Sequence, residues 1–372
     1  MKMYANLYER LVSDENVRKS IKNGFKGKGY RKNVDYILSH MDESVEKYQN
    51  MAEHFYNATH IPKLIYDGVR RKQRYIIVPS NDEQVIHHMV VNTLSPIFMK
   101  GMYEHSYGSI PGRGSHKAKK FISRWLSRDI RNTKYCLQMD IKKFFDSVPH
   151  DILKAKLTRI IKDEKVIQIL FEIIDVQEKG IPLGFYTSQW FANFYLTELD
   201  HYIKEELKAV YYVRYMDDMV IFDGNKKKLH SMRKLLEKFL NTKLGLELKD
   251  NWQVFKIEYV DKDNHRHGRP LDFMGFKFYR DRVILRRSIM LRMSRKAKRM
   301  GSKHKPTIRD CRQFLSYVGW LNATNTYYFY LKHIKPFVNI GKLKKRLSNY
   351  DKRMRKEIIT CGEKCRVQLN PS

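Results

Sequence analysis

The chain has 372 residues, of which 42% are hydrophobic, and carries 73 Lys and Arg against 40 Asp and Glu, a formal net charge of +33. This length and apolar content are enough for a sizeable core, which excludes a disordered protein. So large a basic excess favours a nucleic-acid partner over a merely solubilising surface charge.

The cysteine pattern and the N-terminus show no sign of export. The four cysteines are too few and too scattered for a disulfide framework, and no second pair or nearby histidine completes a zinc site with the last two. They are Cys136, Cys311, Cys361 and Cys365. The first twenty residues lack the apolar core of a signal peptide, and no later run reaches the ~20 apolar residues of a membrane span. We expect a cytoplasmic protein without membrane contact.

The first third of the chain predicts helices around one short strand. Residues 1–60 alternate apolar and charged positions at helical spacing. Residues 74–98 predict a strand, a break, and an amphipathic helix opened by Asn81 or Asp82. A glycine-rich basic loop follows at 107–118.

The middle of the chain predicts a mixed α+β fold. A buried strand ends at Asp140, a turn follows at 147–150, and a Gly/Pro loop at 180–184 leads into a long helix. Two apolar strands around residues 216–218 form a hairpin. A helix at about 226–243 and another hairpin within 271–287 follow, and the chain is helical and strongly basic after residue 288. This order predicts an antiparallel split βαβ sheet with helices on one face.

Three carboxylates stand out in this pattern. Asp217 and Asp218 interrupt the apolar hairpin, and Asp140 ends the strand that we expect beside it. A pair of aspartates in a hairpin is also typical of an ordinary tight turn. Three carboxylates at neighbouring strand ends repel one another unless divalent cations lie between them, and oxygen ligands of this kind suit Mg²⁺. The pattern predicts a two-metal site for phosphoryl transfer.

Four ordered motifs carry a resemblance to reverse transcriptases. They are MDIKKFFDSV (139–148), GIPLGFYTSQWFAN (180–193), RYMDDMVIF (214–222) and LDFMGFKF (271–278), similar to motifs A, B and C and the primer-grip hairpin. The stretch SYVGWLNATNTY (316–327) is similar to the thumb of bacterial reverse transcriptases. The resemblance covers residues 60 to 335.

The resemblance implies a right-hand polymerase whose palm holds an antiparallel, ferredoxin-like sheet. Its regions would be a helical N-terminal segment (1–60), fingers (61–133), palm (134–287), and a basic helical thumb with a C-terminal tail (288–372). Asp140, Asp217 and Asp218 would be catalytic and would bind two Mg²⁺ ions, for which Mn²⁺ can substitute, with help from the Ile141 carbonyl. The partners would be a template RNA, its cDNA and deoxynucleoside triphosphates.

Further residues are implied to contact the incoming nucleotide. Phe145 matches an aromatic that blocks a ribose 2′-OH, and the alternative is a core aromatic beside Phe144. Arg74 matches a fingers arginine that contacts the triphosphate, with a solvated arginine as the alternative, and Lys72 is a weaker candidate. The motif D lysine would be Lys249 or Lys256, which the sequence does not separate.

Motif B departs from the pattern of most bacterial retroelement enzymes. Leu183 and Gly184 followed by Ser188 and Gln189 resemble the pattern in enzymes of diversity-generating retroelements, which copy RNA with errors at adenines and work with a small basic accessory protein. The resemblance implies that all four residues bind the nucleotide. Gly184 would let the backbone approach the nascent pair. Leu183 would replace a glutamine amide that hydrogen-bonds near the nucleotide. An antiphage-defence reverse transcriptase, and a catalytically idle nucleic-acid-binding protein, remain as alternatives.

The basic segment 285–300 is expected to hold template–primer phosphates. The residues assigned to this contact are Arg286, Arg287, Arg292, Arg295, Lys298 and Arg299. A helix here would bury the stripe Ile289, Leu291, Met293 and Ala297. A solvated helix face is the alternative.

Overall fold

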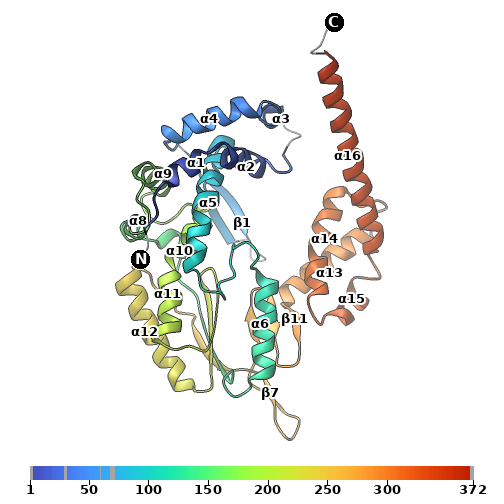
Figure 1. Cartoon of the computed structure of the whole chain (residues 1–372). Coiled ribbons are helices and arrows are strands. Elements are labelled where there is room, and N and C mark those ends of the chain that lie inside the picture. Colours follow the sequence, from blue (N-terminus) through green and yellow to red (C-terminus); the bar gives the residue numbers. More distant parts are fainter. Residues whose placement is uncertain (1–2, 29–31, 59, 68–71, 369–372) are drawn as a thin grey trace. The chain divides into compact units, whose positions relative to one another are not determined.

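The structure is a computed structural model that describes residues 3–28, 32–58, 60–67 and 72–368 (Figure 1). The chain forms two compact units. The first comprises the residues up to Ala118 together with Asp129–Lys256, and the second comprises Lys119–Arg128 together with the residues from Ile257 onward.

The first unit begins with helices, as predicted. These are α1 (Leu7–Val12), α2 (Asp14–Gly24), α3 (Lys32–Ser39) and α4 (Met41–Glu53), and α1, α2 and α4 pack against α5 (Asn81–Gly101). The predicted strand is β2 (Lys72–Ile76), which pairs with β1 (Lys63–Asp67), a strand that the sequence did not indicate. Helix α5 starts at Asn81, but Ser80 caps it, in a reciprocal capping box with Glu83.

The centre of this unit is the predicted antiparallel sheet. Its strands are β3 (Tyr135–Met139), β4 (Tyr211–Tyr215), β5 (Asp218–Asp223) and β6 (Gln253–Lys256), in the order β4-β5-β3-β6. Helix α12 (Lys226–Leu244) packs against β3, β5 and β6 (Figure 1), because leucines along one of its faces are buried. The split βαβ arrangement of a ferredoxin-like palm is thereby confirmed.

Short helices connect β3 to β4. They are α7 (Phe144–Ser147), α8 (His150–Thr158), α9 (Glu164–Ile174), α10 (Tyr186–Tyr195) and α11 (Thr197–His201), followed by a π-helical turn (Tyr202–Glu206). The turn predicted at 147–150 separates α7 from α8. Phe144 and Phe145 begin α7, so this pair is helical and not extended.

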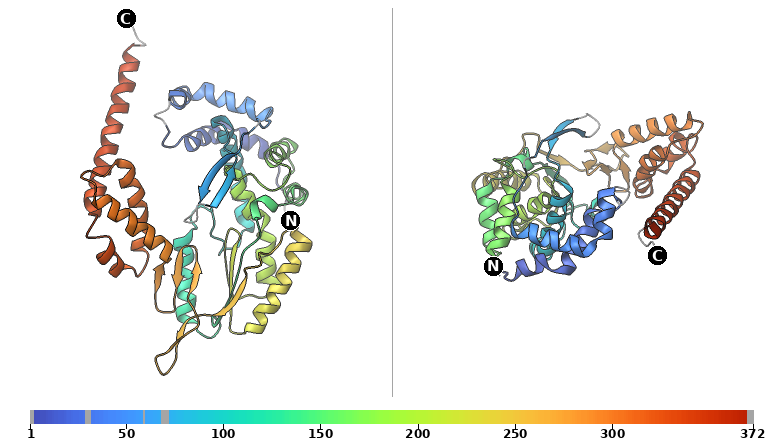
Figure 2. Two further views of the ribbon diagram at one scale, coloured as in Figure 1. Left: turned by 180° about the vertical axis from the view of Figure 1, so that it is seen from behind. Right: turned by 90° about the horizontal axis from the view of Figure 1, so that it is seen from above.

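The second unit combines small sheets with basic helices (Figure 2). Strands β7 (Tyr259–Val260) and β8 (Arg266–His267) form a hairpin, and β9 (Leu271–Phe273), β10 (Phe276–Phe278) and β11 (Val283–Leu285) form a meander. The segment 271–285 is thus a three-stranded sheet and not the two-stranded hairpin we expected. Helix α6 (Ser115–Arg128) belongs to this unit from Lys119 onward, and its Leu126 carbonyl accepts a hydrogen bond of 2.9 Å from Arg280 Nη1.

Helices fill the rest of the second unit, which confirms the predicted helical, basic C-terminal region. They are α13 (Arg287–Gly301), α14 (Ile308–Asn322), α15 (Tyr327–His333) and α16 (Ile340–Gln368). Helix α14 packs against both α13 and α16. No helix in the described ranges combines the length and apolar character that crossing a bilayer requires.

An ion pair in the first unit is completely buried. Arg214 of β4 and Asp200 of α11 are both 0% exposed, and the guanidinium Nε and Nη2 donate to the two carboxylate oxygens at 2.8 and 2.6 Å. The Tyr212 hydroxyl donates to the same carboxylate at 2.6 Å. Because each charge is fully desolvated, removal of either one leaves the other buried without its counter-charge.

Asp200→Asn should therefore lower the free energy of unfolding by about 3–5 kcal/mol, measured by urea denaturation. The control is Asp42→Asn, because Asp42 pairs with Arg18 on the surface, where its side chain is 87% exposed. We expect little change for the control, since solvent screens exposed pairs. Equal effects of the two substitutions would contradict the assigned role of the buried pair.

Candidate active site

The strand register brings the three predicted aspartates to one end of the sheet. Met139 of β3 is opposite Met219 of β5. Asp140 directly follows the first of these residues, and Asp218 directly precedes the second, so the two aspartates lie on neighbouring strands at the same edge. Asp217 lies in the turn between β4 and β5, where Tyr215 is paired with Asp218.

The electrostatics of this edge are those of crowded carboxylates. Burial, followed by the negative charges of Asp140 and Asp218, raises the pKa of Asp217 to about 7. A carboxyl group that holds its proton near neutrality lacks enough positive charge around it. The side chains at this edge offer carboxylate oxygens, the donors that Mg²⁺ prefers, so they could hold a divalent cation.

Lys249 is the basic residue that reaches this site. Its Nζ lies 2.6 Å from Asp140 Oδ2, and its backbone N–H donates to the Asp140 carbonyl at 2.9 Å. The hydrogen bond to Asp140 raises the pKa of the lysine. Lys256 pairs with Tyr135, at the other end of β3. The structure thus separates the two motif D candidates and brings Lys249 to the aspartates.

Residues next to Asp140 show how the site is built into the palm. Ile141 is buried and forms an antiparallel bridge with Leu248, just before Lys249. Phe144 is buried in the core, whereas Phe145 is partly exposed, as expected if only one of the two packs inside. The Phe145 carbonyl accepts a 2.7 Å hydrogen bond from the Ile181 N–H, so the Gly/Pro loop of motif B fixes its backbone.

Gly180 makes this contact between loop and backbone possible. Its φ of +83° is unfavourable for other residues, and a Cβ there would lie 2.4 Å from the Phe145 carbonyl oxygen. The sequence analysis did not assign Gly180 a role. The one signal in the sequence for a role of Gly180 was its position at the start of the Gly/Pro loop.

Motif B contacts the residue that follows strand β2 through the backbone. The Leu183 carbonyl accepts a 2.7 Å hydrogen bond from the Ile77 N–H. Gly184 has φ +117°, and a Cβ there would lie 2.1 Å from the Ile77 carbonyl oxygen. The glycine is thus needed for a close approach of two protein segments, which differs from the approach to a nascent base pair that we expected. Leu183 also lines a pocket of about 630 Å³ together with Tyr75, Ile77 and Asp146.

The remaining predicted nucleotide contacts differ in accessibility. Ser188 is 0% exposed within α10, so the structure does not support its expected direct contact with a nucleotide. Gln189 is partly exposed and accepts a 3.0 Å hydrogen bond from the Ser109 hydroxyl. Arg74 is partly buried in β2, opposite Ile65 of β1. The side chain of Lys72 lies outside the described residues.

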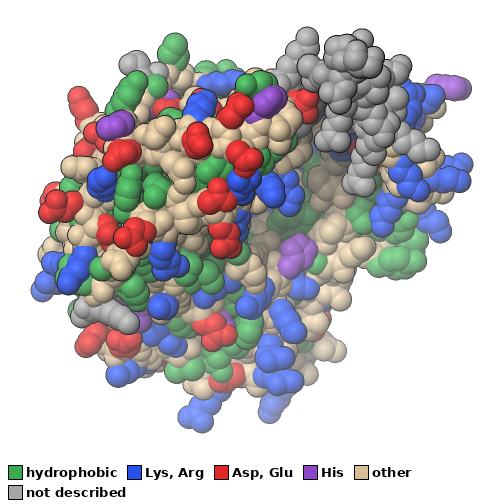
Figure 3. Space-filling view, turned by 45° about the horizontal axis from the view of Figure 1, so that its top comes forward, with side chains coloured by type: hydrophobic (Ala, Val, Ile, Leu, Met, Phe, Trp, Pro, Cys, Tyr) green, Lys and Arg blue, Asp and Glu red, His purple; other side chains and the backbone are tan. Residues whose placement is uncertain are grey.

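Helix α13 presents most of the predicted phosphate contacts to solvent. Arg287, Arg292, Arg295, Lys298 and Arg299 are exposed. Arg286 instead occupies the N-cap position, without a side-chain capping bond, and pairs with Asp272, with Nε 2.6 Å from Oδ1. The buried face contains Met293, Ala297 and Met300, with Ile289 half-buried, whereas Leu291 is 44% exposed, so its predicted place in the buried stripe was wrong. Figure 3 shows Lys and Arg side chains spread over one face of the molecule.

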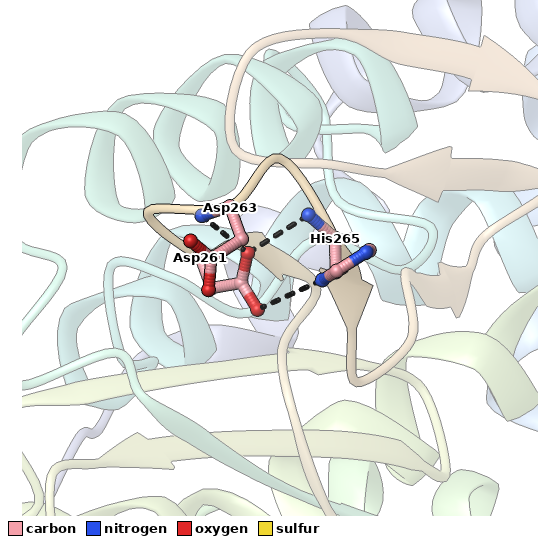
Figure 4. A group of neighbouring side chains, drawn as sticks. All are labelled: Asp261, Asp263 and His265. Carbon is pink, nitrogen blue, oxygen red and sulfur yellow. Dashed lines mark hydrogen bonds and ion pairs between the residues drawn. The ribbon is translucent and has the colours of Figure 1, made fainter.

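A group of possible metal ligands that the sequence analysis did not single out lies at the β7–β8 hairpin (Figure 4). Asp261, Asp263 and His265 each offer a ligand atom within 4.8 Å of the others. No other three His, Cys, Asp or Glu residues in the described ranges meet this criterion, and that includes the aspartates of the palm edge. Asp261 Oδ1 already accepts the backbone N–H groups of Asp263 and His265, and Oδ2 accepts His267 Nε2. These are the contacts of a turn-stabilising aspartate.

Comparison with known proteins places the chain in a family. Residues 61–278 match the family described as "Reverse transcriptase (RNA-dependent DNA polymerase)". Because this match covers more than half of the chain, the protein belongs to that family, and its fold is that of a right-hand polymerase.

Individual relatives are distant. The retron Ec73 reverse transcriptase of Escherichia coli is 26% identical over 214 residues, which are 53% of this chain and 64% of that protein. Protein YkfC of Escherichia coli is 25% identical over 261 residues (58% and 65%). The group II intron-encoded protein LtrA of Lactococcus lactis is 26% identical over 175 residues (43% and 28%). Each match spans less than two thirds of the relative's own length.

The contact of Lys249 with Asp140 gives a test of the site that does not require activity. A divalent ion bound by Asp140 competes with the Lys249 ammonium for the same carboxylate, and so exposed an ion pair is worth roughly 0.2–1 kcal/mol. Lys249→Met should therefore tighten Mn²⁺ binding by up to about 5-fold, as measured by electron paramagnetic resonance titration. Lys256→Met serves as the matched control and should leave the affinity unchanged. An equal response of both variants would remove Lys249 from the site.

Proposed function

We propose that the protein is an RNA-directed DNA polymerase that copies a template RNA into cDNA by two-metal nucleotidyl transfer. The observation that carries this proposal is the meeting of Asp140, Asp217 and Asp218 at one edge of the palm sheet, with Lys249 beside them. Family membership supports the same activity. A nucleic-acid-binding protein without catalysis gains nothing from a cluster that raises the pKa of Asp217 to about 7.

The residues at this edge fit two Mg²⁺ ions. Asp140, Asp217 and Asp218 would supply the carboxylate ligands, and the Ile141 carbonyl would complete the set. When bound, such ions lower the pKa of an attacking hydroxyl and stabilise the leaving pyrophosphate. Lys249, at 2.6 Å from Asp140, is placed to donate a proton or a hydrogen bond to phosphate oxygens at the same edge.

The other predicted residues would select and hold the substrates. Phe145, held by its backbone contact to Ile181, would exclude a ribose 2′-OH. Arg74 would contact the triphosphate. The exposed basic side chains of α13 would bind template–primer phosphates without reading bases, which accords with a net charge of +33. In this assignment the fingers comprise 61–133, the palm 134–287 and the thumb 288–372.

The activity is tested by Mg²⁺-dependent extension of a DNA primer on an RNA template. Asp218→Asn keeps the shape of the side chain but removes a ligand charge, so extension should fall by on the order of 10³-fold or more. Affinity for the template–primer, measured by fluorescence anisotropy, should stay within about twofold, because the basic thumb is unchanged.

Asp263→Asn is the matched control, because Asp263 belongs to the hairpin cluster and not to the palm edge. It should extend the primer like the unchanged protein. Full extension by Asp218→Asn at ordinary Mg²⁺ concentration would disprove the metal site. If the unchanged protein binds RNA tightly but never extends a primer, it is the catalytically idle nucleic-acid-binding protein of the alternative.

We further propose that the polymerase is error-prone and of the diversity-generating type, with a small basic accessory protein as partner. The supporting observation is Leu183, an apolar side chain at motif B that lines the pocket shared with Tyr75, Ile77 and Asp146. A site that lacks a polar contact to the forming pair discriminates less strongly than one that hydrogen-bonds it. An antiphage-defence enzyme with its own non-coding RNA is the alternative.

Leu183→Gln should raise fidelity by about 10-fold or more, most visibly opposite template adenines, because an amide can favour correct pairing geometry. Sequencing the products of both proteins on one adenine-rich RNA provides the measurement. If Leu183 only packs the loop, the new amide is buried without a partner, at a cost of about 1–3 kcal/mol, and activity falls on all templates alike. A uniformly reduced yield with an unchanged error spectrum would reject the fidelity role.

A further inference from the structure

The loop after α5 lies against the turn that carries Asp217 and Asp218. We call residues 105–109 the support loop. Its backbone pairs with β4: the Arg214 N–H donates to the His105 carbonyl at 3.1 Å, and the Tyr107 N–H donates to the Arg214 carbonyl at 2.9 Å. Ser106 forms a parallel bridge with Arg214. The loop therefore continues the palm sheet beyond β4, next to the metal-ligand turn.

The buried Arg214 side chain connects four parts of this region. Beyond its two bonds to Asp200, Nη1 donates to the Met216 carbonyl at 3.1 Å and to Asn193 Oδ1 at 3.2 Å. Its Nη2 also donates to the Ser106 hydroxyl at 3.1 Å. All five guanidinium N–H groups thus have acceptors, and one acceptor is the peptide that precedes Asp217.

Met216 needs this support because its backbone is strained. Its φ of 55° lies in the left-handed region, which a residue with a long side chain adopts at a cost. Gly108 of the support loop is packed directly against it. A Cβ on Gly108 would lie 2.5 Å from Met216 Cγ and 2.7 Å from Met216 N. The absence of a side chain at Gly108 is therefore a condition for the observed turn.

Helix α10 holds the other side of the support loop. Asn193 Nδ2 donates to the Gly108 carbonyl at 2.8 Å and lies 3.5 Å from Met216 Sδ. Four residues earlier on the same helix, Gln189 accepts a hydrogen bond from Ser109. The motif B helix, the support loop and the Met216 turn are consequently one contiguous polar network.

We propose that Arg214 and the support loop are positioning elements of the catalytic site, which fix the Met216 turn so that Asp217 and Asp218 face Asp140 for metal binding. This inference rests on the proposed polymerase function. The hydrogen bonds described above reach the peptide groups of Arg214 and the carbonyl of Met216, and not the carboxylates of Asp217 and Asp218. They therefore act by holding the backbone of the turn in position. A displacement of about 1 Å at catalytic groups can lower a rate by about 100-fold.

Gly108→Ala tests the inference, with Gly114→Ala as its control in the same region of the chain. A Cβ at Gly114 has nothing within 4 Å, and its φ is not in the left-handed range. Gly108→Ala should weaken Mn²⁺ affinity by about 10-fold and lower the rate of single-nucleotide addition at saturating nucleotide by about 100-fold. The KM for the nucleotide and the Kd for template–primer should change by no more than about twofold. Gly114→Ala should match the unchanged protein in every measurement.

The outcomes separate positioning from stability. Normal Mn²⁺ affinity and a normal rate in Gly108→Ala would overturn the inference. Losses of affinity and rate that are no larger than the loss of folded protein, measured by thermal unfolding, would also overturn it. If Gly108→Ala does not fold, Asn193→Ala, which removes the bond to the Gly108 carbonyl without adding an atom, is judged by the same criteria. If the unchanged protein extends no primer while Gly108→Ala still weakens Mn²⁺ binding, the polymerase function fails and the positioning role stands.

Discussion

The repulsion among three carboxylates is the constraint around which the palm is built. Asp140, Asp217 and Asp218 meet at one edge of the sheet, and burial together with the other two charges raises the pKa of Asp217 to about 7. Such a cluster is unstable by itself, so the surrounding structure must hold it in place. Lys249 supplies one positive charge directly to Asp140, and the divalent ions of the proposed function would supply more.

The structure meets this constraint mainly through backbone geometry. Antiparallel pairing of β3 with β5 fixes the distance between Asp140 and Asp218, and the buried pair of Arg214 and Asp200 stabilises the strand that leads into the turn. Glycines allow the close contacts: Gly108 lies against Met216, and Gly184 against Ile77. A charge placed inside the sheet is costly, and its complete pairing is what makes Arg214 tolerable there.

Cations serve two purposes in this protein. In the first unit, Arg214 is paired with Asp200 and Lys249 with Asp140. On α13 of the second unit, by contrast, five of the six predicted phosphate contacts are exposed on a helix whose other face is buried. Exposed cations on a rigid helix can exchange water and counter-ions for phosphates at little cost. Arg286 differs because it pairs with Asp272 at the start of that helix.

Local pattern and tertiary structure each determined a separate part of this protein. The hydrophobic periodicity and the order of the motifs were enough to predict the strands and helices of the antiparallel palm and the hairpin around Met216, because the pattern of each element is local in sequence. The catalytic role of the aspartates remains a prediction. The choice of Lys249 over Lys256 depended on the register of β6 against β3. Arg214, which sequence analysis missed, was visible only as a charge inside an apolar strand, and Asp200, Ser106 and Asn193 gave no local signal. Their roles come from contacts between segments up to about a hundred residues apart, and only packing of the folded chain specifies such contacts.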